Sequence, residues 1–363
     1  MILAVFLVLI ALCLVLEAWS RTAAPKALSA TVTADKRLLE QGVPFHLNYT
    51  LENTGSLPRF DVHINQYTPS SLVPEGSAEA PFTAERVFDW RTPIGPKRKH
   101  TVRIEVTGLS RGRYRIPVCS LYQGDFLGLL ETPVTRVLSI GELVICPRPL
   151  SDSPDLSSAL GGSFGDLSVR RFLYQDPVLF IGCREYTGQE PMKQIAWSRS
   201  ARGQGLMVRE MDHTATYRVS VIFDVQVRTG VFEKELFETA CRMVRSVLEF
   251  LENKGTAYAF ATNARCAGAI TDSRYVPEGI GERHFLSILE LLGRADGHCS
   301  FSGEDLMDAA LYRQGGRVGI ICCTLKEPDD TVRRFVSKAS LSASTVLILS
   351  AVDYLSDEEE KAS

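Results

Sequence analysis

The sequence predicts three parts in order: an N-terminal transmembrane helix, an antiparallel β-sandwich, and an α/β domain built on a doubly wound parallel sheet. Residues 1–16 contain no charged side chain, which predicts the helix. Short runs that alternate apolar and polar residues as far as residue 147 predict the sandwich. From residue 218 onward, continuous apolar runs alternate with helical patterns, which predicts the α/β domain. With 363 residues, the chain is long enough for two domains with full cores.

Composition narrows the class of protein. Hydrophobic residues make up 45% and charged residues 23%, as is typical of a globular chain. The net charge of −3 argues against nucleic acid as the main partner, because phosphate binding needs a basic surface. The nine cysteines include no C-x-x-C pair, so we expect free thiols in a reducing compartment and no zinc site. No motif in the sequence predicts a cofactor.

We expect residues 1–21 to form an uncleaved membrane anchor. A helix over residues 1–19 is about 28 Å long, close to the hydrocarbon thickness of about 30 Å. No Lys or Arg precedes the apolar run, whereas a cleaved signal peptide begins with basic residues. The basic residues that follow the run place the remainder of the chain in the cytoplasm by the positive-inside rule: they are Arg21, Lys26, Lys36 and Arg37. The prediction is therefore a single-pass protein of the cell membrane with cytoplasmic soluble domains.

The β-sandwich is predicted over residues 28–147. Every second residue from Val43 to Leu51 is apolar, which is the period of a strand with one buried face. Glu52–Gly55 supplies a turn, and almost no segment of this region has a helical period. Several short antiparallel strands are typical of an immunoglobulin-like sandwich. Residues 148–168 are rich in Pro, Gly and Ser, which predicts a linker.

The α/β domain is predicted over residues 218–355. Val219–Phe223, Val318–Cys323 and Thr345–Leu349 are continuous apolar strands, as expected of strands buried on both faces. Glu233–Leu251 carries an apolar stripe with helical spacing. Residues 356–363 form an acidic tail, which we expect to be solvated.

A segment dense in charged and aromatic residues, 169–217, lies between these two domains. Its characteristic residues are Arg184, Glu185, Tyr186, Glu190, Lys193, Ile195, Trp197, Ala201, Arg202, Arg209 and Glu210. The order of these residues, together with the earlier Arg111-Gly112-Arg113-Tyr114 stretch, resembles the bacterial family catalogued as domain of unknown function fifty-eight. The resemblance implies a von Willebrand factor A-like fold for the α/β domain. It also implies a protein partner, a MoxR-type AAA ATPase.

Two interpretations of the signature segment stay open. Its arginines and glutamates are suited to forming ion pairs, which would make the segment a structural network. Trp197 offers a flat apolar face and one N–H donor, which would suit a surface for docking a partner. A flat exposed patch around Trp197 would favour an adaptor, whereas a deep pocket with perturbed acids would favour an enzyme.

The resemblance also bears on metal binding. Metal-binding proteins of the von Willebrand A-like fold use Asp-x-Ser-x-Ser after their first strand, and hard oxygen ligands of this kind hold Mg²⁺ or Mn²⁺. Here the matching residues are Asp224, Gln226 and Arg228. We expect Arg228 to pair with Asp224, so that this degenerate site holds no metal.

Two hypotheses of function follow. The first is a membrane-anchored, non-enzymatic scaffold or adaptor that works with a MoxR-type AAA ATPase in envelope protein assembly or maturation. The alternative is an envelope enzyme of unrecognised type acting on peptide or cell-wall substrates.

Overall fold

The computed structural model describes most of the chain. The described residues are 2–22, 27–79, 85–115, 119–125, 130–134, 137–139, 141–150, 154–164, 180–188, 192, 195–201, 205–211, 218–227, 232–268, 275–314, 318–340 and 345–355. The helices are α1 (Ile2–Thr22), α2 (Pro154–Phe164), α3 (Trp197–Ser200), α4 (Lys234–Asn253), α5 (Glu282–Arg294), α6 (Gly303–Gln314) and α7 (Asp330–Ala339).

The chain divides into two compact units, neither of which is continuous in sequence. The first comprises Met1–Pro149, Arg265–Thr271 and Leu286–Asp296. The second comprises Leu150–Ala264, Asp272–Phe285 and Gly297–Ser363. A short two-stranded sheet pairs β18 (Ala264–Cys266) with β20 (Ala295–Cys299).

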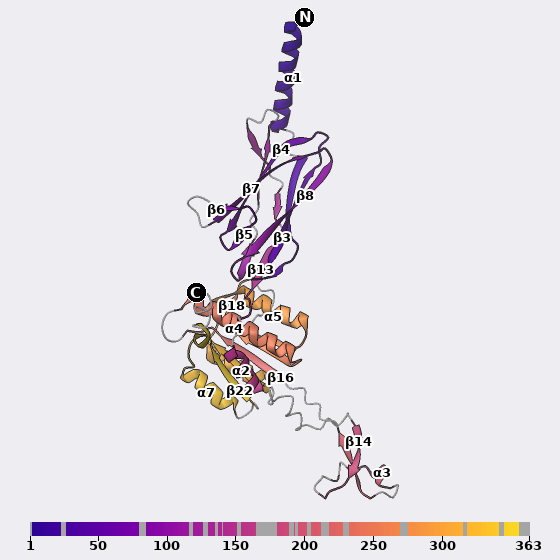
Figure 1. The fold of residues 1–363 in the computed structure, drawn as a ribbon, viewed down its shortest axis with the longest axis vertical. Helices are drawn as coiled ribbons and strands as arrows, with labels where there is room; N and C mark the ends of the chain where they lie inside the picture. Colours follow the sequence, from indigo (N-terminus) through magenta and orange to yellow (C-terminus); the bar gives the residue numbers. More distant parts are fainter. Residues whose placement is uncertain are drawn as a thin grey trace. The chain divides into compact units, whose positions relative to one another are not determined.

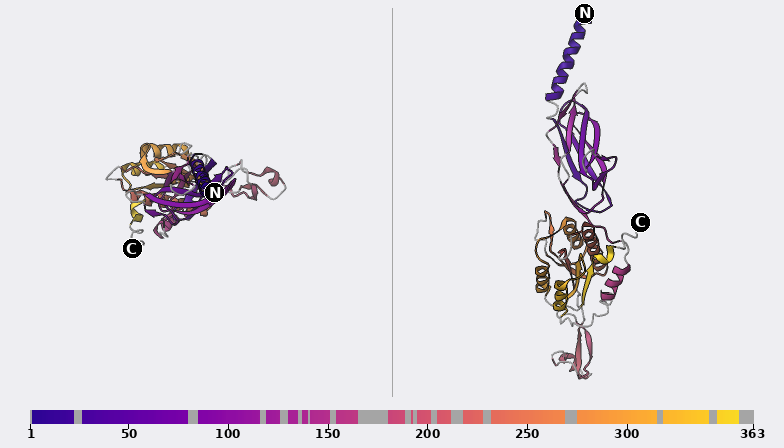
Figure 2. Two further views of the ribbon diagram at one scale, coloured as in Figure 1. Left: turned by 90° about the horizontal axis from the view of Figure 1, so that it is seen from above. Right: turned by 90° about the vertical axis from the view of Figure 1, so that its left-hand side faces the viewer.

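The first unit contains a β-sandwich-like body, visible in Figures 1 and 2. One five-stranded sheet has the order β12-β1-β3-β8-β5, and the other has the order β11-β10-β4-β7-β6. A three-stranded sheet has the order β2-β13-β9. These strands are β1 (Leu28–Ala34), β2 (Leu38–Glu40), β3 (Pro44–Asn53), β4 (Arg59–Pro69), β5 (Leu72–Pro74), β6 (Ala78–Glu79), β7 (Glu85–Ile94), β8 (Arg98–Gly108), β9 (Gly112–Arg115), β10 (Ser120–Gly124), β11 (Glu131–Pro133), β12 (Val137–Ser139) and β13 (Glu142–Cys146).

The alternation predicted from Val43 to Leu51 is confirmed from Phe45 onward by strand β3, whereas Val43 precedes the strand and is 50% exposed. Phe45, Leu47, Tyr49 and Leu51 are each no more than 3% exposed, whereas the residues between them are more accessible. They share one core with Val62 and Ile64 of β4, which belongs to the opposite sheet. Burying one face of each sheet in this way is what holds a sandwich together.

The second unit contains a mixed sheet of order β19-β17-β16-β21-β22. Strands β17, β16, β21 and β22 run parallel, and β19 runs antiparallel to β17. Their bounds are β16 (Arg218–Asp224), β17 (Ala257–Thr262), β19 (Tyr275–Gly279), β21 (Val318–Thr324) and β22 (Thr345–Ser350). The apolar stripe predicted over Glu233–Leu251 is buried in α4.

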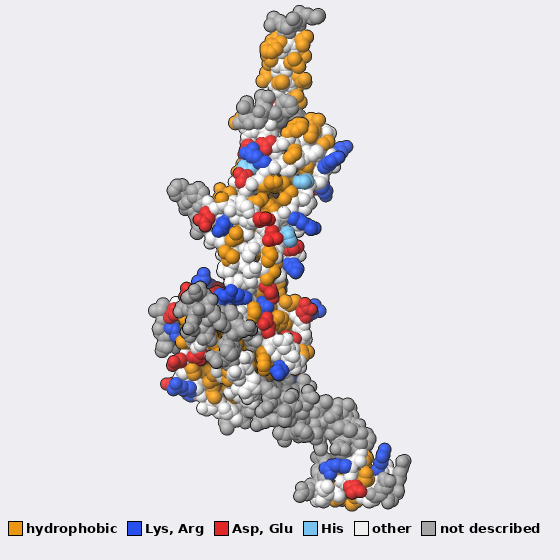
Figure 3. Space-filling model, in the orientation of Figure 1, with side chains coloured by type: hydrophobic (Ala, Val, Ile, Leu, Met, Phe, Trp, Pro, Cys, Tyr) orange, Lys and Arg blue, Asp and Glu red, His pale blue; other side chains and the backbone are white. Residues whose placement is uncertain are grey.

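The predicted fold class is wrong in two respects. The apolar run of α1 stops at Leu16, and the helix continues through Glu17 and Arg21 to Thr22. In the part of the chain that the structure describes, no helix is both long enough and apolar enough to cross a membrane. The exposed large side chains of α1 are nevertheless apolar (Figure 3).

The von Willebrand A-like α/β class is the second error. The described chain is mostly β-sheet, with 22 strands in several sheets, and only five of them belong to the mixed sheet. Continuous apolar strands between helices predict local parallel pairing, because both strand faces are covered. They do not determine how many strands the sheet contains, or that an antiparallel strand such as β19 closes its edge.

The stretch predicted as a linker contains helix α2, whose Leu156 and Leu160 are buried. All nine cysteines are free thiols, as predicted; five of them are buried, and Cys13 and Cys299 are exposed.

One glycine marks a close approach within the first unit. A Cβ added to Gly293 of α5 would lie 2.5 Å from Cγ1 of Val144 and 3.0 Å from the carbonyl oxygen of Ile145. The helix backbone therefore packs directly against β13, at a distance that only glycine permits.

We predict that Gly293→Ala lowers the free energy of unfolding by about 1–3 kcal/mol, because the added methyl group overpacks this contact. Denaturant titration measures the change. Gly161→Ala in α2 is the matched control, because a Cβ there meets nothing within 4 Å. Both substitutions gain up to about 1 kcal/mol of helix propensity, so the control should be neutral or stabilising. Equal effects of the two substitutions would contradict the close approach.

Candidate functional site

Polar residues gather where the parallel strands of the second unit end. Strand β16 ends at Asp224, β17 ends at Thr262 and is followed by Asn263, and β21 ends at Thr324. Successive strands are added on one side of β16 and then on the other, so the strand order reverses between β16 and β21. In open sheets of parallel strands, ligands bind beside the carboxyl ends of the strands at such a point. The strand ends around Asp224 are therefore a candidate site by position.

A buried carboxylate lies at its centre. Asp224 is 1% exposed, and its Oδ1 accepts hydrogen bonds from Nδ2 of Asn263 at 2.7 Å and from the backbone N–H of Gln226 at 2.9 Å. Asn263 is fully buried, and its Oδ1 accepts a hydrogen bond from the N–H of Val225 at 2.9 Å. Asp224 and Asn263 thus join the ends of β16 and β17 through side-chain hydrogen bonds.

The neighbouring polar groups are bonded to backbone atoms. Oε1 of Gln226 accepts from the N–H of Gly303, the first residue of α6, at 2.7 Å. The Thr262 hydroxyl accepts from the N–H of Ala264 at 3.0 Å, and the Thr324 hydroxyl donates to the carbonyl of Lys326 at 2.8 Å. These hydrogen bonds position the loops that leave the sheet. They also avoid the free-energy cost of burying a polar group without a hydrogen-bond partner.

The residues predicted as a degenerate metal site are only partly described. Asp224 and Gln226 lie together at the strand end, linked by the backbone hydrogen bond. Arg228 lies outside the described residues, so its pairing with Asp224 stays a prediction. Across the described ranges, no group of three or more His, Cys, Asp or Glu side chains is arranged to hold a metal ion.

The signature segment forms a small structure of its own, which we call the signature hairpin (described residues 180–188, 192, 195–201 and 205–211). Strand β14 (Phe180–Glu185) pairs antiparallel with β15 (Met207–Met211), and Ile195 forms a bridge with Val208 on the other side of β15. Ile195 and Val208 are 4% and 2% exposed, respectively. Trp197 begins the single turn of α3 and is 58% exposed.

The charged and aromatic signature residues differ in their surroundings. Arg184 and Glu185 are exposed on β14, and Tyr186 is half-buried, with its N–H donating to the carbonyl of Leu206 at 2.8 Å. Ala201 is exposed. In β15, Arg209 lies opposite Cys183 and Glu210 lies opposite Gly182. Glu190, Lys193 and Arg202 are outside the described residues, and the predicted ion-pair network of the segment stays a prediction.

The Arg111–Tyr114 stretch has a role that the sequence analysis missed. Arg111 is 8% exposed, and its Nη1 donates to the carbonyls of Leu292 and Ala295, at 2.5 and 2.8 Å, where α5 ends. A cation at this end of a helix satisfies its last carbonyls and opposes the negative end of the helix dipole. The only sequence signal was the motif itself, because Leu292 lies far along the chain from Arg111.

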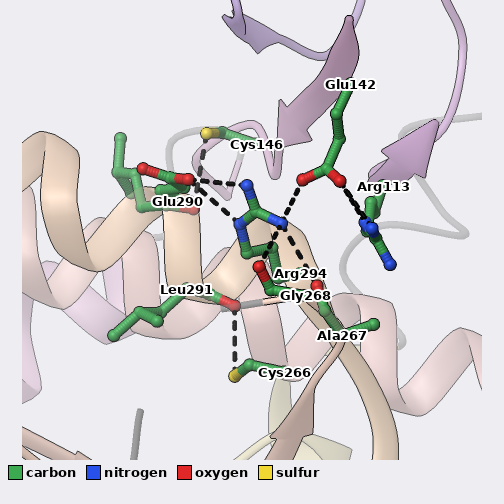
Figure 4. A network of polar contacts seen from close by, with 10 residues as sticks. Arg113, Glu142, Cys146, Cys266, Ala267, Gly268, Glu290, Leu291 and Arg294 are labelled. Atoms are coloured by element: carbon green, nitrogen blue, oxygen red, sulfur yellow. Dashed lines mark hydrogen bonds and ion pairs between the residues drawn. The ribbon is translucent and has the colours of Figure 1, made fainter. Parts of the chain in front are cut away.

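Figure 4 shows a cluster of polar contacts in the first unit, centred on Arg294. Glu142 of β13 lies between two guanidinium groups: Oε2 contacts Nε of Arg113 at 2.7 Å, and Oε1 is paired with Nη1 of Arg294. Arg294, only 10% exposed, also binds Glu290 one turn back at 2.8 Å and donates to the carbonyls of Ala267 and Gly268. The thiols of Cys146 and Cys266 donate to α5 carbonyls nearby.

The charges of this cluster shift the titration of Glu142. Partial burial disfavours the ionised carboxylate, but hydrogen bonds from Arg113 and Arg294, and the charges of both, outweigh burial and lower the pKa of Glu142. The arrangement is suited to holding strands and helix together.

No protein-family model matches this chain, and no curated protein matches it. Among solved structures it is similar to a CARDB domain from Pyrococcus furiosus in complex with di-metal ions, with 9% identity and a TM-score of 0.22 over 32% of this chain and 91% of that one. It is also similar to a cohesin module of a Clostridium perfringens family 33 glycoside hydrolase, with 11% identity and a TM-score of 0.24 over 33% and 97%. A cohesin from Archaeoglobus fulgidus gives 13% identity and a TM-score of 0.22 over 32% and 91%.

We predict that Asp224→Ala lowers the free energy of unfolding by about 1–3 kcal/mol, because the buried Nδ2 of Asn263 and the part-buried N–H of Gln226 lose their acceptor. Asp224→Asn keeps an acceptor oxygen and should cost less, as measured by denaturant titration. Titrating the wild-type chain with Mg²⁺ should leave its melting temperature unchanged, because only a ligand that prefers the folded state raises it. A saturable rise that Asp224→Ala abolishes would show a working metal site.

We also predict that Glu142→Gln flattens the acid limb of the stability curve. A lowered pKa in the folded state means that the carboxylate stabilises the fold above the ordinary Glu pKa of about 4.3, and that this contribution is lost as pH falls through the lower, folded pKa. Melting temperatures recorded between about pH 2 and pH 7 measure the difference. Glu304→Gln is the control, because the Glu304 side chain is 60% exposed and its ion pair with Arg334, at 3.2 Å, lies outside this cluster. Parallel curves for Glu142→Gln and wild type would contradict the prediction.

Proposed function

We propose that this chain is a non-enzymatic protein-interaction adaptor, and that the signature hairpin is its docking surface. The observation that carries the proposal is the exposure of large apolar side chains on a very small structure. Met192 is 68%, Trp197 58% and Leu206 46% exposed. Trp is among the residues that contribute most to protein interfaces, since it buries a large area and has few rotamers to lose.

Basic side chains accompany these apolar residues. Arg184 on β14 and Arg199 in α3 are both exposed. Arg is enriched at protein interfaces because its planar guanidinium group forms paired hydrogen bonds with carboxylates and stacks on flat surfaces. A partner with an apolar pocket beside acidic groups would match both features of the hairpin.

Among the side chains of the hairpin that the structure describes, few are buried and apolar. They are Ile195, Ala196 and Val208. A two-stranded hairpin is only marginally stable in water, and it gains stability when a further surface covers one of its faces. Covering Trp197 with a partner would supply that burial, so binding and ordering of the hairpin would be coupled.

The family resemblance suggests the partner. A MoxR-type AAA ATPase is the protein that the resemblance implies, and the process that it favours is envelope protein assembly or maturation. Both belong to the proposal and rest on the signature residues of the hairpin.

We predict that Trp197→Ala weakens partner binding at least tenfold while leaving the melting temperature nearly unchanged, because the side chain is exposed in the free chain and buried in the complex. The measurement is affinity capture with the full chain, quantified by mass spectrometry, followed by titration with a purified MoxR-type AAA ATPase from the same cells. Tyr312→Ala on α6 is the matched control, because Tyr312 is 91% exposed and lies outside the hairpin.

Two results would count against the adaptor. One is the same set of captured proteins for wild type, Trp197→Ala and Tyr312→Ala. The other is a Trp197→Ala variant that unfolds, which would indicate a structural tryptophan. A third result is that Trp197 is needed to capture other proteins but the ATPase does not bind. That result would support the docking surface and contradict only the proposed partner.

A further inference from the structure

Strand β8 of the sandwich has a long edge that no described strand covers. Strand β8 pairs with β3 from Arg98 to Thr107. On its other side, β5 pairs with β8 only at Val106, Thr107 and Gly108. On that side, the stretch from Arg98 to Ile104 therefore has no strand beside it in the described part of the chain.

The direction of the backbone groups along this edge follows from two hydrogen bonds. The carbonyl of Glu105 accepts from the N–H of Glu75, which lies on the β5 side, at 2.8 Å. The carbonyl of His46 in β3 accepts from Asp35, on the β1 side. In antiparallel sheets the N–H and C=O of a residue point the same way, and the direction alternates along the strand. Lys99, Thr101 and Arg103 therefore present their N–H and C=O groups to the uncovered side.

Apolar side chains line the margin of the core beside this edge. Phe88 and Trp90 of β7 and Val102 of β8 are only partly buried and pack against the sandwich core. The Trp90 and His100 rings stack with their centroids 6.2 Å apart, and Phe88 lies 6.2 Å from the ring of Tyr49. A strand added along β8 could cover part of this margin with every second side chain.

The outward face of the same edge is basic. Lys99 and Arg103 point away from the core, and Lys99 pairs with Glu52 of β3 at 3.2 Å. In Figure 3, basic side chains gather on the flank where Figure 1 labels β8. Opposite charges on directly facing residues stabilise paired strands, and like charges destabilise them.

We propose that the β8 edge binds an extended partner peptide with alternating apolar and acidic residues, which adds to the sheet as a further strand. Main-chain hydrogen bonds to Lys99, Thr101 and Arg103 supply the pairing, the apolar side chains cover the core margin, and the acidic side chains face Lys99 and Arg103. This is the recognition mode of strand addition at an open sheet edge.

Two alternatives fit the edge less well. A second copy of the chain paired antiparallel through its own β8, centred on Thr101, would place Lys99 opposite Arg103, which is a like-charge pair. The edge of β7 is less suited to binding the peptide, because Pro93 has no N–H to donate. In addition, Arg91 is already paired with Asp61 and Glu131 at 2.9 and 2.6 Å.

The test uses the full chain and a synthetic peptide, acetylated (Glu-Val)4 amide, with (Lys-Val)4 as the charge control. Without peptide, the amides of Lys99, Thr101 and Arg103 should exchange with solvent faster than those of His100, Val102 and Ile104, which are bonded to β3. With (Glu-Val)4, exchange at Lys99, Thr101 and Arg103 should slow, whereas (Lys-Val)4 should have a much smaller effect. Residue-resolved hydrogen exchange measures both.

A matched pair of variants isolates the backbone contribution. Thr101→Pro removes one outward N–H and leaves the hydrogen bonds to β3 in place, so it should weaken peptide binding at least about tenfold. Thr101→Val also loses the hydroxyl contact with Thr50, at 3.1 Å, but keeps the N–H, and should bind within about twofold of wild type. The inference is overturned if the three outward amides are already protected in the free chain, if (Glu-Val)4 protects none of them at millimolar concentration, or if Thr101→Pro binds as well as Thr101→Val.

Discussion

The first unit depends on one carboxylate. Glu142 lies between Arg113 of β9 and Arg294 at the end of α5, and Arg294 in turn binds Glu290 and two backbone carbonyls. Removing water from any one of these charges alone would be costly, so the group is stable only when all members are present. Arg111 acts beside it on the last carbonyls of the same helix. Together these contacts require the helix backbone to approach β13 closely, and Gly293 is the residue that permits the approach.

In the second unit, the side chains at the strand ends and those of the signature hairpin have contrasting surroundings. At the strand ends, Asp224, Asn263 and Gln226 are hydrogen-bonded to one another and to loop backbone. In the signature hairpin, by contrast, large apolar and basic side chains are accessible, and few of the apolar side chains described there are buried. Rigid, satisfied polar groups are typical of structural support, whereas an exposed aromatic side chain on a marginal hairpin is typical of a surface that is completed by a partner. For this reason the proposed function rests on the hairpin rather than on the strand ends.

Part of the fold could be predicted because its cause is local. The alternation in β3 and the helical stripe of α4 each record which side of an element faces a core, and both were confirmed. The predicted fold class failed because it combined correct local patterns into a global arrangement that they do not specify. The linker prediction overlooked α2. A segment rich in Ser and Gly can still be helical when two leucines on one face, here Leu156 and Leu160, are buried.

By itself the sequence determined the strand periodicity of the sandwich, the apolar strands and amphipathic helix of the second unit, and the presence of a motif at Arg111–Tyr114. Only the tertiary structure decided what that motif contacts, because the carbonyls that Arg111 binds lie more than a hundred residues away along the chain. Likewise, only the sheet order revealed that no described strand covers the β8 edge from Arg98 to Ile104. The pattern of one strand reports which of its faces is buried, but whether another strand lies beside it depends on where distant segments pack.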